Sequence, residues 1–190
     1  MYLFLDTETT GIPRNYNAPA SDLRNWPRLV QLAWILTDPQ ANEIVAAEYI
    51  VKPEGFVIPK DATKVHGITT EQAQRTGVDL RSVLVEIVAG IQKASVLVAH
   101  NMQFDEKILG AELLRSGHPN IVSSKKRMCT MQSATNYCKL PGPYGYKWPT
   151  LQELHQELFN EQFTGAHRAL VDVRACAKCY FELKRRKIVA

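Results

Sequence analysis

The chain has 190 residues, enough for one domain with a sizeable core, and 45% of them are hydrophobic while 22% are charged. That balance excludes disordered and fibrous proteins, and no stretch is apolar for long enough to cross a membrane. The formal net charge of +4 is compatible with a polyanionic partner without establishing one. The apolar opening, Met1–Asp6, is too short for a signal peptide and lacks a basic lead-in, which predicts a cytoplasmic location.

Strands are expected in the first part of the chain. Tyr2–Asp6, Arg28–Thr37 and Glu43–Val51 are short apolar runs bounded by turn residues, which is the pattern of strands. The turn at Asp38–Pro39 leaves only a short connection between the second and third runs. We therefore expect these two to pair antiparallel, as a hairpin or meander.

Helix and strand alternate in the middle of the chain. Apolar residues recur with helical spacing over Leu80–Ile91, and Asp79 is the expected N-cap of this helix. Ser95–Ala99 is predicted to be a buried strand. A further helix is predicted over Met102–Arg115, with Gly117 as its C-terminal stop.

Shorter elements are expected in the last third. The sequence allows a short strand over 127–129 and a short helix after it, followed by a loop rich in Pro, Gly and Tyr over Leu140–Pro149. Thr150 and Glu153 form a capping-box pattern that opens the next helix, and a last helix is predicted from about Arg168.

The order of elements predicts the fold class. Three strands are followed by alternating helices and strands, which indicates an α/β domain with a mixed sheet covered by helices. We expect residues 1–190 to form a single domain.

The four cysteines offer no zinc site or disulfide framework. Cys176 and Cys179 have metal-like spacing, but no second Cys or His pair completes a site. Since both fall in a predicted helix, we expect them to be small buried hydrophobes.

Acidic residues stand where predicted strands end and helices begin. Asp6 and Glu8 lie two residues apart at the end of the first strand, so both point to the same side. Asp105 falls in the first turn of one helix, and Asp172 near the start of the last, shortly after His167. Neighbouring carboxylates raise each other's pKa unless a cation compensates, and Mg²⁺ prefers their oxygens. Each position alone also has an ordinary explanation: a solvated acid, a helix-end charge, or an exposed histidine.

Taken in order, the segments Asp6–Gly11, His100–Asp105 and His167–Asp172 resemble the three exonuclease motifs of the DnaQ-like family, the DEDDh 3′–5′ exonucleases. The segment His66–Thr69 is also similar to a recurrent segment of that family, and the resemblance spans residues 1 to about 180. It implies an RNase H-like fold with a mixed five-stranded sheet flanked by helices. It also implies hydrolysis of phosphodiester bonds at a 3′ end, with release of 5′-mononucleotides.

The resemblance implies a two-metal mechanism carried by four carboxylates and one histidine. Asp6 is expected to bridge two divalent ions, Mg²⁺ or Mn²⁺, while Glu8 and Asp172 bind the ion on the nucleophile side. Asp105 supports the second ion directly or through water. His167 is expected to act as general base on the attacking water, a task suited to its unperturbed pKa of about 6.5.

Contacts to the terminal nucleotide are implied in the same way. Backbone groups of Thr9, Thr10 and Gly11 are expected to meet it, and a glycine permits close approach of the backbone. Asn101 and Phe104 are expected to line the same pocket.

Other positions have two interpretations. Ile68 is similar to an apolar residue that wedges beside the terminal base, but a core isoleucine fits equally well. His66 is expected to be structural or to contact phosphate. Trp26, Trp34 and Tyr144 are candidates for stacking on bases, although the strand position of Trp34 favours the core.

Three functions are compatible with the sequence. The first is a 3′–5′ exonuclease acting on DNA in proofreading or repair, either free-standing or as a polymerase subunit. The second is an exoribonuclease acting on RNA 3′ ends, because the motifs do not report how a 2′-OH is recognised. The third is an inactive module that binds nucleic acid or a polymerase, which the presence of all four acids and His167 argues against. Because the chain ends soon after its last helix, we expect a free-standing enzyme or a compact subunit, and the sequence does not indicate its oligomeric state.

Overall fold

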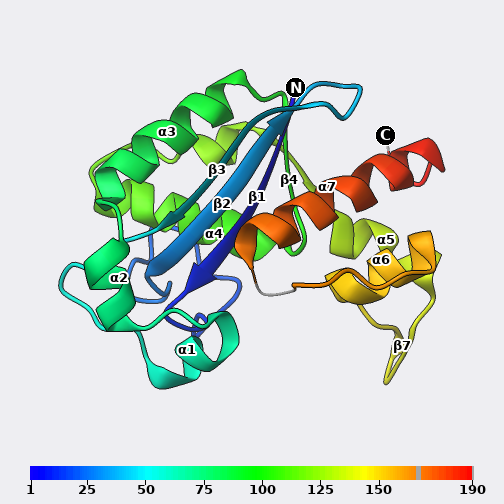
Figure 1. Ribbon diagram of the computed structural model, residues 1–190. Coiled ribbons are helices and arrows are strands. Elements are labelled where there is room, and N and C mark those ends of the chain that lie inside the picture. The colour runs from blue at the N-terminus through cyan, green and yellow to red at the C-terminus, as the bar shows by residue number, and fades with distance from the viewer. Residues whose placement is uncertain (166–167, 190) are drawn as a thin grey trace.

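The computed structural model describes residues 1–165 and 168–189, and within them five strands form one sheet in the order β3-β2-β1-β4-β5 (Figure 1). The strands are β1 (Tyr2–Thr9), β2 (Leu29–Thr37), β3 (Glu43–Ile50), β4 (Val96–Ala99) and β5 (Lys126–Cys129). β2 pairs antiparallel with both β1 and β3, whereas β4 pairs parallel with β1 and β5. The predicted mixed five-stranded sheet, with its antiparallel meander, is confirmed.

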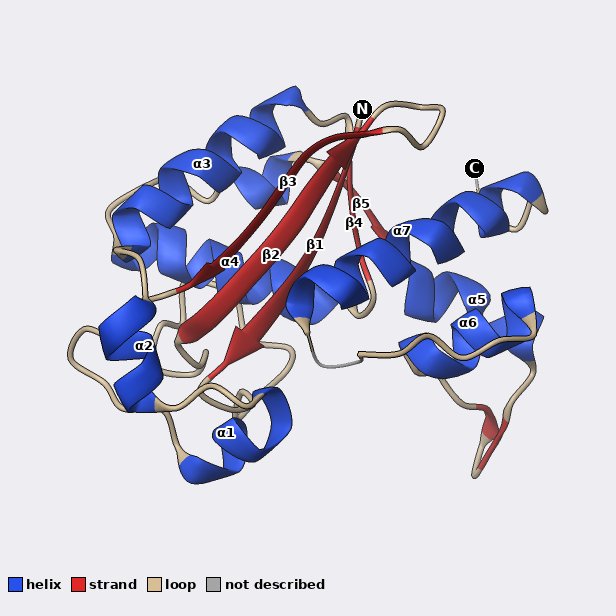
Figure 2. Cartoon of the chain, viewed as in Figure 1, coloured by secondary structure: helices blue, strands red, loops and turns tan. Residues whose placement is uncertain are grey.

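Helices cover both faces of the sheet (Figure 2). One face packs against α3 (Leu80–Lys93) and α4 (Met102–Arg115), and the other against α5 (Thr130–Cys138), α6 (Leu151–Phe159) and α7 (Ala169–Arg185). Successive side chains of β1 point to opposite faces of the sheet, so Leu3 and Leu5 enter the core on the first face and Phe4 enters the core on the second. β1 thus lies at the centre of the molecule, between α4 and α7.

Several short elements were not predicted. They are α1 (Lys60–His66), α2 (Thr70–Thr76), a 3₁₀ turn at Ile121–Ser124, and the hairpin strands β6 (Pro141–Gly142) and β7 (Gly145–Tyr146). At two to seven residues, none is long enough to show a clear hydrophobic period. The loop predicted over Leu140–Pro149 therefore contains a hairpin.

The predicted end of the first strand was also wrong. β1 continues past Asp6 to Thr9, because its pairing with β2 extends to Glu8 opposite Gln31. The acids Asp6 and Glu8 therefore lie inside a paired strand, which fixes the direction of each side chain.

The structure contains the two helix N-caps that were predicted from the sequence. The Asp79 carboxylate accepts a hydrogen bond from the Ser82 backbone N–H, and Thr150 and Glu153 form the predicted capping box. Asn101 occupies the N-cap position of α4 in a left-handed conformation, with φ 86°, and its side chain makes no capping hydrogen bond. Asn101 therefore does not cap α4 through its side chain.

A buried ion network ties the segment between β1 and β2 to α4. The Glu112 side chain is completely buried, and its Oε1 accepts hydrogen bonds from Arg28 Nε at 2.9 Å, Arg115 Nη1 at 3.0 Å and the Leu29 backbone N–H at 3.0 Å. Arg115 also donates to the carbonyl oxygen of Trp26 at 2.6 Å. Two guanidinium groups thus compensate this one buried carboxylate.

All four cysteines are buried thiols, as expected of Cys176 and Cys179. Burial raises the pKa of the Cys179 thiol to about 12, which keeps it protonated and unreactive. Within the part of the chain that the structure describes, no helix has the length and apolar character needed to span a membrane.

Candidate active site

Three of the predicted acids line one cavity at the edge of the sheet where the parallel strands β1 and β4 end. The cavity has a volume of about 360 Å³ and is lined by Asp6 and Glu8 from β1, Asp172 from the first turn of α7, and His100 directly after β4. Asp6 and Glu8 alternate along β1 with Thr7, so they share the face that α7 covers. The sheet and α7 together bring acids from opposite ends of the sequence to one place.

The fourth acid reaches β1 from the other side. Asp105 lies in the first turn of α4 and is only 3% exposed. Its Oδ1 accepts hydrogen bonds from the Thr7 backbone N–H at 3.0 Å and from the Thr7 hydroxyl at 2.8 Å. Thr7, between the two strand acids, therefore holds Asp105 beside them. We did not predict this role of Thr7, although its place between two acids on an alternating strand was a usable signal.

Buried negative charge defines the electrostatics of the site. Burial raises the pKa of Glu8 to about 7, and the neighbouring carboxylate of Asp172 adds to the effect. Burial also raises the pKa of Asp105 to about 7, although the hydrogen bonds from Thr7 oppose it. The pKa of Asp6 is raised well above its ordinary value by burial and then by the surrounding acids. Within residues 1–165 and 168–189, no Lys or Arg forms an ion pair with Asp6, Glu8 or Asp105.

The donor set fits a hard divalent cation. Carboxylate oxygens are the ligands that Mg²⁺ and Mn²⁺ prefer, and a cation would relieve the repulsion that raises these pKa values. In the described residues, no three His, Cys, Asp or Glu side chains are gathered closely enough to hold an ion in their present positions. Binding of a cation by three of these acids would therefore require their side chains to move closer together.

His100 forms the wall of the cavity and carries no charge. Its Nε2 lies 3.0 Å from the carbonyl oxygen of Pro149, and its Nδ1 lies 2.9 Å from the Thr130 hydroxyl. Since a carbonyl can only accept, Nε2 carries the proton and Nδ1 accepts from Thr130. Burial lowers the pKa of His100 to about 4, so the ring is neutral at pH 7. It links β4, α5 and the segment before α6, a role that the sequence did not indicate.

The predicted general base, His167, lies outside the described residues. The predicted substrate contacts Thr9, Thr10 and Gly11 lie at the end of β1 and in the bend that follows it. The Thr9 hydroxyl donates to the Gly11 carbonyl at 2.6 Å, and the Thr10 hydroxyl accepts from the Arg28 backbone N–H at 3.0 Å. Gly11 has φ 150°, a conformation that residues with a side chain rarely adopt.

The remaining predicted substrate contacts differ in how deeply their side chains are buried. Ile68 is 4% exposed and packs in a small cluster with Val30, which fits the core interpretation. The His66 ring is buried, and its Nδ1 accepts from the Ile68 backbone N–H at 3.1 Å. Burial lowers the pKa of His66, and the backbone of Thr9 opposes this shift, so α1 lies against the end of β1. Asn101 and Phe104 are half-buried at the start of α4.

The three aromatic residues predicted as candidates for stacking on bases also differ in exposure. Trp26 and Trp34 are 3% and 4% exposed, so neither ring is open to a base. Tyr144 is fully exposed at the tip of the β6–β7 hairpin.

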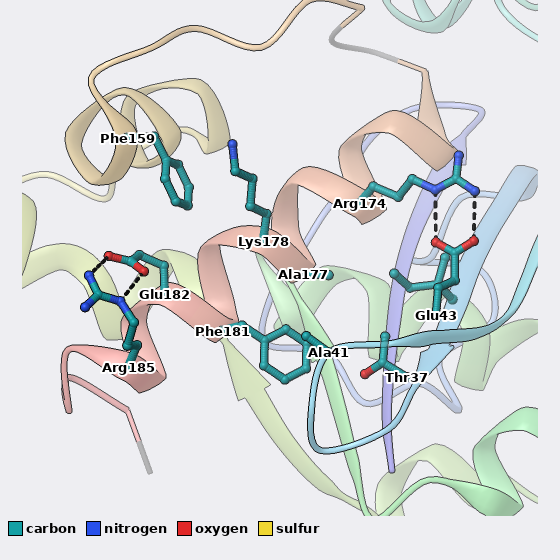
Figure 3. Close-up of a pocket in the computed structure, with 11 residues that line it drawn as sticks. Thr37, Ala41, Glu43, Phe159, Arg174, Ala177, Lys178, Phe181, Glu182 and Arg185 are labelled. Carbon is teal, nitrogen blue, oxygen red and sulfur yellow. Dashed lines mark hydrogen bonds and ion pairs between the residues drawn. The ribbon is translucent and has the colours of Figure 1, made fainter.

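A larger hollow of about 460 Å³ lies between α7 and the strands β2 and β3 (Figure 3). Its charged groups are already paired, and Lys178 binds Glu161 outside the hollow. Arg174 binds both carboxylate oxygens of Glu43 at 2.9 and 3.0 Å, and Arg185 binds Glu182. None of the four predicted metal ligands lines it, so we assign no catalytic role to this hollow.

Comparison with known structures gives matches over nearly the whole chain. Escherichia coli exonuclease I in complex with a dA16 oligonucleotide has a TM-score of 0.76 at 22% identity, covering 98% of this chain and 41% of that one. The zinc-bound form of the E. coli exonuclease I–single-stranded DNA complex has a TM-score of 0.77 at 21% identity, covering 98% and 41%. Exonuclease I from Methylocaldum szegediense has a TM-score of 0.75 at 22% identity, covering 98% and 40%. The present chain thus spans about two-fifths of the length of these proteins and shares their RNase H-like exonuclease fold.

A comparison with curated protein sequences finds none that matches the chain. A family model described as exonuclease, RNase_T, matches residues 3–180. That match covers most of the chain and includes all four acids. The chain therefore belongs to the exonuclease family, which confirms the DnaQ-like 3′–5′ exonuclease membership predicted from its motifs.

Proposed function

We propose that this enzyme removes 5′-mononucleotides from the 3′ end of DNA by metal-dependent hydrolysis. The observation that carries the proposal is the gathering of four acids around one strand, where no Lys or Arg of the described residues forms an ion pair with Asp6, Glu8 or Asp105. Asp6, Glu8 and Asp172 line one cavity, and Thr7 holds Asp105 on the other side of the same strand. Acids of raised pKa in a cleft are typical of a catalytic site.

Two Mg²⁺ or Mn²⁺ ions are the proposed cofactors. Asp6, Glu8 and Asp172 would hold one ion, and Asp6 with Asp105 the other. Such ions supply the positive charge that activates an attacking water and stabilises the leaving 3′ oxygen. The zinc ion in a related exonuclease I structure is consistent with a divalent metal in this fold.

The protein groups have separate tasks in this proposal. The hydrogen bonds from Thr7 keep the Asp105 carboxylate oriented towards the site. The neutral ring of His100 fixes the wall of the cavity through Pro149 and Thr130. His167 would take the proton of the attacking water, a role that rests on the sequence alone.

DNA is the proposed substrate rather than RNA. The solved E. coli exonuclease I structures contain dA16 and dT13 oligonucleotides, which supports DNA as the substrate of this fold. The terminal nucleotide would meet backbone groups of Thr9, Thr10 and Gly11. Asn101 and Phe104, half-buried at the start of α4, would line its other side. His66, the last residue of α1, and Ile68, shortly after it, would support this pocket.

We also propose that residues 1–190 act as one domain in the cytoplasm, in proofreading or repair. A polymerase is the partner that proofreading would require. A primer with a mismatched 3′ terminus would then be shortened faster than its matched counterpart, and equal rates would contradict a proofreading role.

The central test is nuclease profiling of the purified chain. Matched single-stranded DNA and RNA, labelled at the 5′ end, are incubated with Mg²⁺, with Mn²⁺ or with EDTA. We expect a ladder of shortened DNA, 5′-mononucleotide product, slower loss of RNA, and no reaction in EDTA. Faster digestion of RNA would contradict DNA as the proposed substrate. Cleavage that persists in EDTA would contradict the metal-dependent mechanism.

A further inference from the structure

The β6–β7 hairpin exposes a cluster of aromatic side chains. Tyr144 is fully exposed, and Tyr146 and Trp148 are 52% and 58% exposed. A soluble protein usually covers a group of such rings, and an uncovered group indicates a binding surface. We call Tyr144, Tyr146 and Trp148 the aromatic cluster.

The members of the aromatic cluster share one concave surface. All three line a hollow of about 450 Å³ together with Pro143 and Lys147. The hairpin projects away from the body of the molecule beside α6 (Figure 1). Its rings are therefore accessible to an extended ligand.

The hairpin is attached directly to the wall of the catalytic cavity. The Lys147 backbone N–H donates to the Leu140 carbonyl at 3.0 Å, which closes the base of the hairpin. The Pro149 carbonyl, next to Trp148, accepts from the ring of His100 at 3.0 Å. Since Thr150 and His100 line the cavity, the aromatic cluster begins within two residues of the proposed reaction site.

Charge on the hairpin suits a polyanion. The stretch 139–148 contains two lysines, Lys139 and Lys147, and no acid. Both lysines are exposed, and the ion pair of Lys147 with Glu153 is at the surface, where such pairs exchange readily. Aromatic rings interleaved with lysines are typical of surfaces that bind single-stranded nucleic acid.

We propose that the aromatic cluster stacks on unpaired bases upstream of the 3′ nucleotide that occupies the catalytic cavity. This inference rests on the proposed exonuclease function and adds a second binding region to it. Every base has a π-face, so such stacking tolerates any sequence but requires that the bases be unpaired. The enzyme should therefore favour single-stranded 3′ ends that extend beyond the cavity.

Intrinsic fluorescence offers a direct binding test. Trp26 and Trp34 are buried, so Trp148 dominates the fraction of the emission that acrylamide quenches. In EDTA, which blocks cleavage, oligothymidylate should quench this fraction and protect it from acrylamide. Trp148→Phe should abolish the response. A response that persists in Trp148→Phe, or no response in the wild-type chain, would overturn the proposal.

Kinetics then separate the aromatic cluster from the catalytic cavity. Two substrates are compared: a short oligothymidylate, and the p-nitrophenyl ester of thymidine 5′-monophosphate, which is too small to reach the hairpin. Tyr144→Ala and Trp148→Ala should raise KM for the oligonucleotide about tenfold more than KM for the ester. Val85→Ala, an exposed site on α3, is the matched control and should change neither value.

The outcomes distinguish the two proposals. If the wild-type chain hydrolyses neither substrate, the proposed function fails. If it hydrolyses both and the hairpin variants show the same KM ratio as the wild type, the function stands and the stacking inference is wrong. A hairpin variant that keeps this ratio but loses binding to a purified protein partner would assign the cluster to protein docking, which also overturns the inference. Circular dichroism melts of each variant check that the fold is retained.

Discussion

Helix α4 carries two buried acids with opposite surroundings. Near its C-terminal end, Glu112 is completely buried and contacts two guanidinium groups, those of Arg28 and Arg115. Two turns earlier, Asp105 is almost as deeply buried, but it accepts hydrogen bonds from the uncharged Thr7 and lies near the acids of β1. Of the two buried carboxylates on this helix, one is thus compensated by positive charge and the other is not.

The difference separates a structural acid from a functional one. A buried charge paired with an opposite charge supports the fold, because loss of either partner would leave the other uncompensated. A buried charge among like charges costs stability, and that cost is relieved when a ligand supplies the missing positive charge. This comparison makes three predictions, which differ in whether activity or stability responds.

The largest expected effect is on activity. Asp6→Asn should lower kcat on oligonucleotide DNA by about a thousandfold or more, because a catalytic metal ion contributes several kcal/mol to the transition state. The urea midpoint of the same variant, measured in EDTA, should stay the same or rise, because one repelling charge has been removed. A variant that keeps full activity would contradict the assignment of Asp6 as a metal ligand.

Glu112→Gln should have the opposite effects. Loss of the Glu112 carboxylate leaves Arg28 and Arg115 without their shared partner. The free energy of unfolding should therefore fall by about 3 kcal/mol in urea titrations. The kcat of the folded protein should stay within about twofold of the wild-type value, since a change below 1 kcal/mol alters a rate by only a few-fold. A large drop in kcat without loss of stability would remove the distinction between the two ends of α4.

The smallest expected effect concerns pH. Burial raises the pKa of Glu8 from 4.5 and that of Asp105 from 3.8, both to about 7. Between the unfolded and folded values the folded chain binds more protons, so its stability falls as pH rises through this window. In EDTA, the thermal midpoint should therefore drop by at least about 2–4 °C between pH 5 and pH 8 from this cause.

Glu8→Gln is the variant that isolates this effect. It removes one of the raised carboxyls, so the drop should be smaller than in the wild type. Adding Mg²⁺ at pH 8 should raise the wild-type midpoint more than that of the variant, because a ligand that binds the folded state stabilises it. A wild-type midpoint that rises with pH in EDTA would contradict the uncompensated burial of these acids.

The sequence predicted the sheet, the main helices and the positions of the acids, because these follow from hydrophobic period and alternation. Asp6 and Glu8 share a face for the same reason that Leu3 and Leu5 share the other. The capping box at Thr150 was equally predictable, since all its groups lie within one turn.

What the sequence could not provide depends on contacts between distant segments. Glu112 and Arg115 look like a surface ion pair at i,i+3 spacing, and only the packing of the β1–β2 segment buries them. The link from His100 to Pro149 likewise joins residues far apart in the chain. The hairpin at 141–146 is too short for any periodic signal, so of its exposed rings only Tyr144 was predicted as a candidate for stacking.

The packing of α7 on β1 has a consequence for synthesis of the protein. The acids on β1 emerge from the ribosome first, whereas Asp172 on α7 emerges only when nearly the whole domain has been made. On the proposed mechanism, a partly made chain lacks one metal ligand and remains inactive. Cleavage thus begins only once α7 has docked on β1, so a nascent chain that stops before α7 has no nuclease activity.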